Sequence, residues 1–284
     1  MKIELELKKM LDFIYACNVD SNHGNDLSNQ TLMAENYLKR LKTIDKDGFD
    51  KIIRDIENKL KLIIWDFDGV IADSEKIWLK NRMAYFNDHL GVNWDFDTVN
   101  KYFGGMADKT KRQVLEKLGF QTDDKFWKEI LEIDVAYMKK FGNEKMSGVD
   151  NILQDQTLKQ CVATGGTKYK TKFKTDIIGL NKYISDEKVF TVDLVEKGKP
   201  EPDLFLYAAK QMGEKPEQCL VIEDSIAGMT AGLKAGMKVA AFLGSEIYQN
   251  QAYIDKVKSL GIENIFYNMR DLYDFIKLTF DKNN

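Results

Sequence analysis

Five short, largely continuous runs of apolar residues most constrain the fold of this chain. They are LKLIIWDF (60–67), KQCVAT (159–164), KVFTVDLV (188–195), QCLVIED (218–224) and MKVAAFL (237–243). Such runs are typical of parallel strands, because helices cover a parallel sheet on both faces. Segments with helical patterns at 203–213 and 225–237 separate the later runs. The order of strands and helices predicts an α/β fold built on a doubly wound parallel sheet.

Residues 75–147 interrupt this order, because they carry helical patterns and no strand pattern. Amphipathic segments occupy 76–91, 108–120 and 124–142. We therefore expect an α/β core made of 61–74 and 148–284, with an α-helical cap inserted at 75–147. An insertion after the first strand would lie over the sheet edge at which open α/β sheets bind ligands.

The first sixty residues differ from the rest in pattern. Helical patterns at 3–16, 31–44 and 48–60 surround a polar, turn-rich linker at 18–30. We expect a helical N-terminal extension over residues 1–60. Three roles remain open for it: a dimerisation arm, a partner-binding unit, or packing on the core.

The composition excludes several classes of function. Of 284 residues, 44% are hydrophobic and 31% charged, as in ordinary globular proteins. A net charge of −3 provides no electrostatic footprint for nucleic acid or an anionic membrane. No apolar run is long enough to span a bilayer, and the N-terminus lacks a signal-peptide pattern. Three widely spaced cysteines suit a reducing, cytoplasmic location, and two histidines argue against a histidine triad or zinc cluster.

Two carboxylates, Asp66 and Asp68, follow the first apolar run directly, ahead of Gly69. Residues two apart on an extended chain point to the same side, so both side chains would face one spot. Neighbouring carboxylates raise each other's pKa unless a cation lies between them. A hard divalent cation such as Mg²⁺ prefers carboxylate oxygens. The alternative is that an Asp merely forms a turn at the end of the strand.

A second acidic pair, Glu223 and Asp224, ends the run at 218–224. Ser225 follows it and can cap the next helix. Two strands of one sheet that both end in acidic pairs can together form a single cation site.

Two further motifs can bind phosphate. Lys199 precedes Pro200 and Pro202, and prolines restrict the backbone around them, so this lysine is held rigidly. A lysine near paired carboxylates neutralises them and binds phosphate as a point charge. Thr164 and Gly165 end the second run, where a hydroxyl and backbone N–H groups can hold phosphate oxygens. A solvated loop lysine and an ordinary strand turn are the alternatives.

Together and in this order, the motifs resemble the haloacid dehalogenase superfamily. The chain is most similar to the phosphatase and β-phosphoglucomutase-like branch, in which a helical cap follows the first motif. The matching stretches are WDFDGVIADSE, VATGG, KGKPEPDLF and VIEDSIAGMTAGLKAGM. The resemblance covers about residues 60–280, and the first and fourth motifs are the most specific.

The resemblance implies a role for each motif. Asp66 would attack phosphorus and form an aspartyl-phosphate. Asp68 would protonate the leaving oxygen and then activate the water that cleaves the intermediate. Phosphate-binding residues would be Thr164, Gly165 and Lys199.

The resemblance also implies a Mg²⁺ cofactor. Its ligands would be the Asp66 carboxylate, the Asp68 backbone carbonyl and Asp224, with Glu223 acting through water or from the second layer. An anionic nucleophile reaches an anionic phosphate only when cations screen the repulsion between them.

These features predict a Mg²⁺-dependent phosphatase for a small phosphorylated metabolite, either a phosphosugar or a related phosphorylated acid. A phosphomutase is the first alternative. Asp108 stands where the cap arginine of a mutase is expected, although Lys109 would partly substitute if the alignment shifts by one residue. A catalytically silent binding protein is the second alternative. Candidate substrate contacts in the cap are Lys80 and Lys109, each of which can equally be a solvated helix residue.

Overall fold

The computed structural model describes residues 59–104, 108–248 and 250–280. The chain divides into two units, Met1–Lys59 and Leu60–Asn284, and the described residues from Leu60 onward belong to the second. The helical extension predicted for residues 1–60 therefore lies outside the described residues, except for its last two positions.

A six-stranded sheet in the order β3-β2-β1-β4-β5-β6 forms the centre of this unit, and every pair of neighbouring strands is parallel. The strands are β1 (Leu62–Trp65), β2 (Lys159–Thr164), β3 (Val189–Thr191), β4 (Cys219–Glu223), β5 (Lys238–Phe242) and β6 (Ile265–Phe266). The predicted doubly wound parallel sheet is confirmed. The chain leaves β1 toward β2 and β3 and then returns to β4, so the strand order reverses between β1 and β4. Open α/β sheets bind their ligands at such a switch point.

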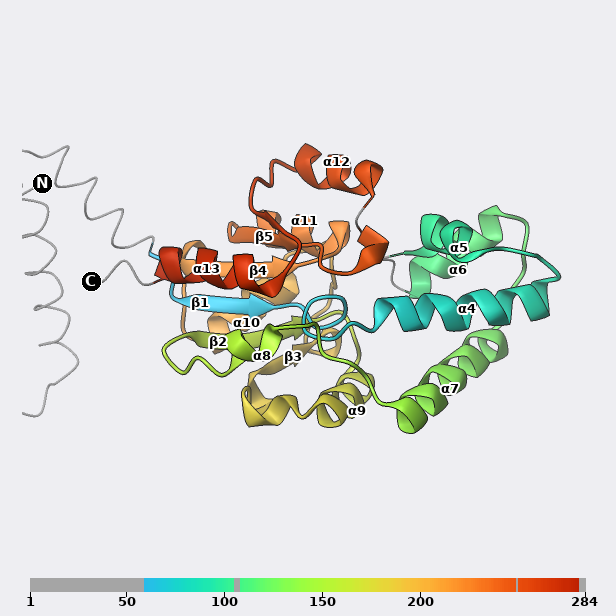
Figure 1. Cartoon of the computed structure of the whole chain (residues 1–284), viewed down its shortest axis with the longest axis horizontal. Helices are drawn as coiled ribbons and strands as arrows, with labels where there is room; N and C mark the ends of the chain where they lie inside the picture. Colours follow the sequence, from blue (N-terminus) through green and yellow to red (C-terminus); the bar gives the residue numbers. More distant parts are fainter. Residues whose placement is uncertain (1–58, 105–107, 249, 281–284) are drawn as a thin grey trace, which may run out of the picture. The chain divides into compact units, whose positions relative to one another are not determined.

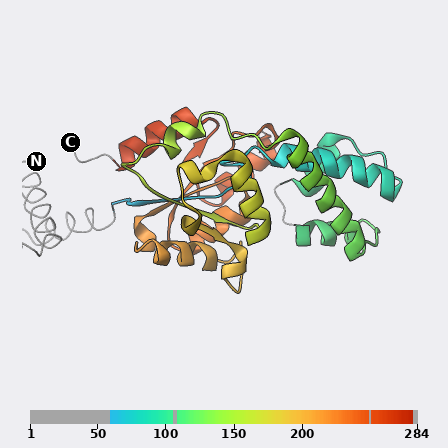
Figure 2. The ribbon, with the colours of Figure 1, turned by 90° about the horizontal axis from the view of Figure 1, so that it is seen from below.

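Helices cover both faces of the sheet (Figures 1 and 2). Successive residues of β1 point to opposite faces: Leu62 and Ile64 join one buried cluster, and Ile63 and Trp65 join the other. The first cluster contains residues of α10 (Asp203–Gln211), α11 (Ile226–Lys234) and α12 (Gln251–Ser259). The second contains residues of α8 (Val149–Leu153), α9 (Lys168–Ile178) and α13 (Met269–Phe280).

Between β1 and α8, the described elements of regular structure are α-helices. They are α4 (Glu75–Leu90), α5 (Phe96–Phe103), α6 (Asp108–Lys117) and α7 (Asp124–Phe141). In Figure 1 these four helices lie beyond the carboxyl end of β1. Aromatic rings form their centre: the Phe86 ring lies 5.2 Å from that of Phe103 and 5.9 Å from that of Phe126, measured between centroids. Helix α5, which the sequence reading missed, begins where the Asp95 carboxylate accepts a hydrogen bond from Thr98 N at 2.8 Å.

One predicted strand is much shorter than expected. The apolar run at 188–195 forms strand only over Val189–Thr191 and then turns through a 3₁₀ segment, Val192–Leu194. Asp193 in this turn accepts a hydrogen bond from the backbone N–H of Lys168 at the start of α9. The Asp193 carboxylate thus holds the turn to the start of α9, and Asp193 is not part of a buried strand. Among the described helices, none is long and apolar enough to cross a membrane.

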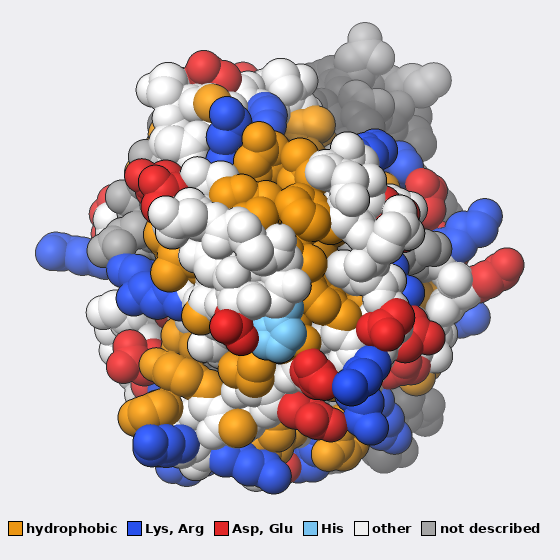
Figure 3. Space-filling view, turned by 90° about the vertical axis from the view of Figure 1, so that its right-hand side faces the viewer, with side chains coloured by type: hydrophobic (Ala, Val, Ile, Leu, Met, Phe, Trp, Pro, Cys, Tyr) orange, Lys and Arg blue, Asp and Glu red, His pale blue; other side chains and the backbone are white. Residues whose placement is uncertain are grey.

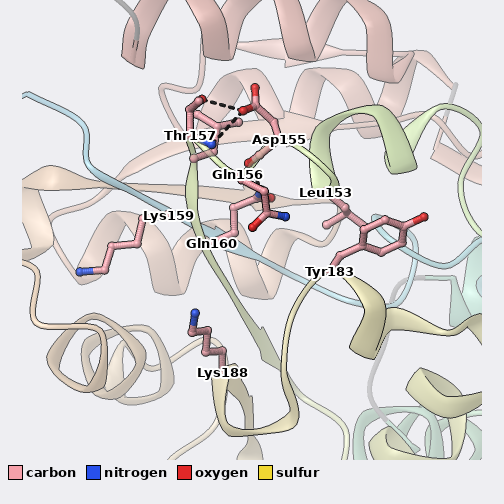
Figure 4. Close-up of a pocket in the computed structure, with 9 residues that line it drawn as sticks. Leu153, Asp155, Gln156, Thr157, Lys159, Gln160, Tyr183 and Lys188 are labelled. Atoms are coloured by element: carbon pink, nitrogen blue, oxygen red, sulfur yellow. Dashed lines mark hydrogen bonds between the residues drawn. The ribbon is translucent and has the colours of Figure 1, made fainter.

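Two of the hollows on the surface of the described residues lie away from the carboxyl end of β1. One, of about 350 Å³, is lined by Gln121, Thr122, Asp123 and Phe126. The other, of about 300 Å³, lies at the start of β2 and is lined by Asp155, Gln160 and Tyr183 among others (Figure 4). Neither hollow is lined by the acidic pairs that follow β1 and end β4, so the candidate active site is sought at the carboxyl edge of the sheet. Seen from the end that carries α4–α7, hydrophobic, acidic and basic side chains are interspersed (Figure 3).

Candidate active site

Asp66 and Gly69 stand at the carboxyl end of β1. The ladder with β4 extends one residue past the strand, since Asp66 N donates to Ile222 O at 2.9 Å. Gly69 then turns the chain with a φ of +85°, where a side chain would be strained. A Cβ on Gly69 would also lie 1.8 Å from Asp224 Oδ2. The glycine is therefore required for the first motif to approach the fourth.

Lys199 lies between the two strand ends. Its Nζ donates to Asp66 Oδ1 and, at 2.6 Å, to Glu223 Oε1. The side chain is only 9% exposed, and its Nζ lies 4.8 Å from the centroid of the Phe205 ring. The peptide bond between Lys199 and Pro200 is cis. The structure thus brings Lys199 together with an acid from each of the first and fourth motifs.

Asp66, Glu223 and Asp224 form a buried acidic cluster. Each offers one carboxylate oxygen, and these oxygens all lie within 4.8 Å of one another. Burial raises the pKa of Asp66 to about 7; the charge of Lys199 opposes this shift, and the charge of Glu223 adds to it. Carboxylate oxygens gathered at one buried point are the ligands that a hard divalent cation prefers, so this donor set fits Mg²⁺.

The fourth motif is held by its own backbone and by α11 and α12. Ser225 Oγ accepts a hydrogen bond from Gly228 N at 3.0 Å and so caps α11, as predicted. Ser225 N and Oγ both donate to Glu223 Oε2, at 2.7 and 2.9 Å. Tyr253 Oη donates to Asp224 O at 2.7 Å. These contacts orient both acids toward the end of β1.

Asp68 is held by residues that the sequence reading did not single out. Its Oδ1 accepts a hydrogen bond from Ser74 Oγ at 2.6 Å, and its Oδ2 accepts one from Lys174 Nζ. Burial alone would raise the pKa of Asp68, but Lys174, Ser74 and the charge of Lys111 together lower it. In the structure Lys174 lies on the buried face of α9 together with Thr171 and Thr175, and because these residues are polar no apolar periodicity marks that face in the sequence.

Thr164 is the last residue of β2, next to β1, and is 2% exposed. Its Oγ1 accepts a hydrogen bond from Gly166 N at 3.1 Å, which shapes the turn that follows. Gly165 in this turn is exposed. Thr164 thus lies at the carboxyl edge of the sheet on the strand beside that of Asp66.

Two lysines, Lys80 and Lys109, were predicted as substrate contacts in the helical insertion. Lys80 is exposed on α4, and within the described residues no hydrogen bond or ion pair joins it to the acidic cluster. Lys109 lies in α6, but its side chain is outside the described part of the structure. Lys111, two residues further along α6, is instead buried, at 3% exposure.

A parallel sheet with acidic pairs at two adjacent strand ends, a buried lysine between them and a helical insertion defines a class of hydrolases. A family profile described as haloacid dehalogenase-like hydrolase matches residues 63–242. The chain belongs to this family.

Relatives of known name agree with this class. The 6-phosphogluconate phosphatase of Escherichia coli (strain K12) is 26% identical over 189 residues, covering 65% of this chain and 83% of that protein. The phosphoglycolate phosphatase of Aquifex aeolicus is 27% identical over 201 residues, covering 69% of this chain and 91% of that protein.

A solved structure is similar as well. The haloacid dehalogenase-like protein of unknown function from Agrobacterium tumefaciens superposes with a TM-score of 0.69 at 25% identity, covering 77% of this chain and 98% of that chain. The enzyme class of the chain is therefore that of its relatives, the phosphoric monoester hydrolases.

Proposed function

We propose that this protein is a Mg²⁺-dependent phosphatase that hydrolyses a small phosphorylated metabolite, a phosphosugar or a related phosphorylated acid. One observation carries the proposal: Asp66, Glu223 and Asp224 converge with Lys199 at the switch point between β1 and β4. The names of the two phosphatases reported above support the substrate class, because both contain a phosphorylated acid.

In this proposal Asp66 attacks phosphorus as the ester oxygen departs, and an aspartyl-phosphate forms. Asp68 gives its proton to the leaving oxygen and then takes one from the attacking water, which releases phosphate. Lys199 lies against Asp66 and would neutralise phosphoryl oxygens. Thr164 and Gly165 would donate to the remaining oxygens.

The metal ligands would be the Asp66 carboxylate, the Asp68 carbonyl and Asp224, with Glu223 supporting them through water. When bound, Mg²⁺ would screen the repulsion between the anionic nucleophile and the phosphate. We further propose that helices α4–α7, residues 75–147, act as a cap over the core formed by 61–74 and 148–284. A closed cap excludes bulk water from the reaction.

Two buried, free cysteines support a reducing compartment for this enzyme. Cys161 and Cys219 are both buried without a disulfide, and burial raises the pKa of the Cys219 thiol to about 12. We infer from them a cytoplasmic enzyme.

Turnover of p-nitrophenyl phosphate with Mg²⁺, in wild type and Asp66→Asn, tests this function. We expect activity in wild type that EDTA removes, and no activity in Asp66→Asn, because an amide does not attack phosphorus. No wild-type turnover, or full turnover by Asp66→Asn, contradicts the proposal. A screen of phosphorylated metabolites by kcat/KM then identifies the substrate. Conversion of a sugar phosphate into an isomer without release of phosphate would favour a mutase instead.

A further inference from the structure

Lys174 is a buried lysine that none of the four motifs contains. Its side chain is 8% exposed, and it points inward from α9 together with Thr171 and Thr175. Burying an ammonium group is costly unless it is paired and hydrogen-bonded. Such a residue therefore calls for a specific partner.

The partner is Asp68. Lys174 Nζ forms an ion pair with Asp68 Oδ2, and it lies 5.2 Å from the ring centroid of Phe67 and 6.0 Å from that of Trp78. Cation–π contacts of this length favour a lysine that is shielded from water. A Cβ placed on Gly166 would be 4.0 Å from the same Nζ. The ammonium group thus lies among the first motif, the turn after β2, and α4.

Both oxygens of Asp68 are held, each by a different element. Ser74 Oγ donates to Oδ1 at 2.6 Å from just before α4, and Lys174 donates to Oδ2 from α9. Without Lys174, the carboxylate would keep the hydrogen bond from Ser74 but lose the ion pair that holds its other oxygen. A proton donor must lie within hydrogen-bond reach of the atom that receives the proton, and a misplacement of about 1 Å can cost about a hundredfold in rate.

We propose that Lys174 is a positioning residue that fixes the Asp68 carboxylate for proton transfer to the leaving oxygen of the substrate. This inference rests on the proposed phosphatase function. In the substrate complex the neighbouring anionic phosphate favours the protonated form of Asp68. As the bond from phosphorus to the leaving oxygen breaks and the bond from Asp66 to phosphorus forms, that proton passes to the leaving oxygen. Asp68 regains a proton from the water that cleaves the intermediate. Lys174 itself touches neither phosphorus nor the leaving group.

Two substrates that differ in their need for a proton test this role. A p-nitrophenolate group leaves unprotonated, whereas an alkoxide requires the proton of Asp68. In the holoenzyme with Mg²⁺, we expect Lys174→Met to lower kcat/KM for an alkyl phosphate about a hundredfold, and for p-nitrophenyl phosphate less than about threefold. Lys174→Arg keeps the charge and should recover part of the alkyl phosphate rate.

Lys172→Met is the matched control. Lys172 lies on the same helix but is 50% exposed and pairs with Asp176 and, at 3.1 Å, with Asp186. We expect it to leave kcat/KM for both substrates unchanged. Circular dichroism of each variant reports its folding; if Lys174→Met does not fold, Lys174→Arg carries the same comparison with a smaller selective loss.

Equal losses on both substrates would overturn the positioning role, because they would indicate phosphate binding or folding instead. An unchanged alkyl phosphate rate would overturn it as well. These results leave the phosphatase function intact as long as the wild type turns over both substrates. A wild type without turnover of either substrate would overturn both proposals.

Discussion

Lys199→Met removes the cation that two buried carboxylates share. The Lys199 side chain is 9% exposed, and those of its partners Asp66 and Glu223 are 10% and 1% exposed. Methionine has a similar length, so the main change is the lost charge. Removing one partner from a buried ion pair costs about 3–5 kcal/mol of unfolding free energy. At about 2–4 °C per kcal/mol for a domain of this size, the metal-free variant should melt roughly 6–20 °C below wild type.

The loss of stability in Lys199→Met should grow as the pH rises. Burial raises the pKa of Asp66 to about 7 even though Lys199 opposes the shift, so removing Lys199 raises this pKa further. Between the unfolded and folded pKa values, the folded protein holds a proton that the unfolded chain lacks. Stability contributed by this group therefore falls as pH rises through that interval. The deficit of Lys199→Met should be largest near pH 8 and smallest near pH 5, where Asp66 is protonated in both proteins.

Thermal unfolding in EDTA, followed by circular dichroism at both pH values, measures this deficit. Excess Mg²⁺ should recover part of it, because a ligand that binds only the folded state stabilises that state. Lys172→Met serves as the control and should stay within about 0.5 kcal/mol of wild type. The reasoning is refuted if Lys199→Met melts with wild type near pH 8 in EDTA, or if its deficit is larger near pH 5.

Further substitutions test the packing around the site and among helices α4–α7. Gly69→Ala should lower both stability and turnover, because its Cβ would lie 1.8 Å from Asp224 Oδ2. Gly91→Ala is the control, because Gly91 has a positive φ of +66° but open space around it. It should lower the free energy of unfolding by about 1–2 kcal/mol and leave turnover unchanged. Arg82→Met should lower the free energy of unfolding, measured by chemical denaturation, by about 3–5 kcal/mol. The reason is that it removes the cation of the buried Arg82–Asp134 ion pair while the Asp134 carboxylate stays buried. Changing Asp134 to Leu as well should restore most of the loss.

The sequence predicted the sheet well because each central strand is buried on both faces. The runs at 159–164, 218–224 and 237–243 coincide with β2, β4 and β5 to within a residue at each end. The run at 188–195 failed because its apolar residues do not all enter the sheet, and Asp193 turns the chain after three strand residues. The two-residue strand β6 is too short to leave a pattern.

Some residues of the candidate site were predictable from the sequence and others were not. The acids Asp66, Glu223 and Asp224 were predictable because they stand at the ends of recognisable strands, and the sheet itself brings strand ends together. Lys199 was predictable because it precedes a pair of prolines. Lys174 was not predictable, because its contact with Asp68 depends on which face of α9 packs toward the first motif. One lysine among several in KYKTKFKTDII gives no sign of which one is buried. Contacts made between separate elements are set by tertiary packing rather than by local pattern.

The proposed mechanism requires that Asp66 becomes phosphorylated during turnover. Its most direct test is rapid acid quenching of the wild-type enzyme with Mg²⁺ and a good substrate, followed by peptide mass spectrometry. We expect the peptide containing Asp66 to gain the mass of one phosphoryl group, and the same peptide from Asp66→Asn to keep its mass. Steady turnover with no phosphorylated peptide, or with the phosphoryl group on another residue, would contradict it.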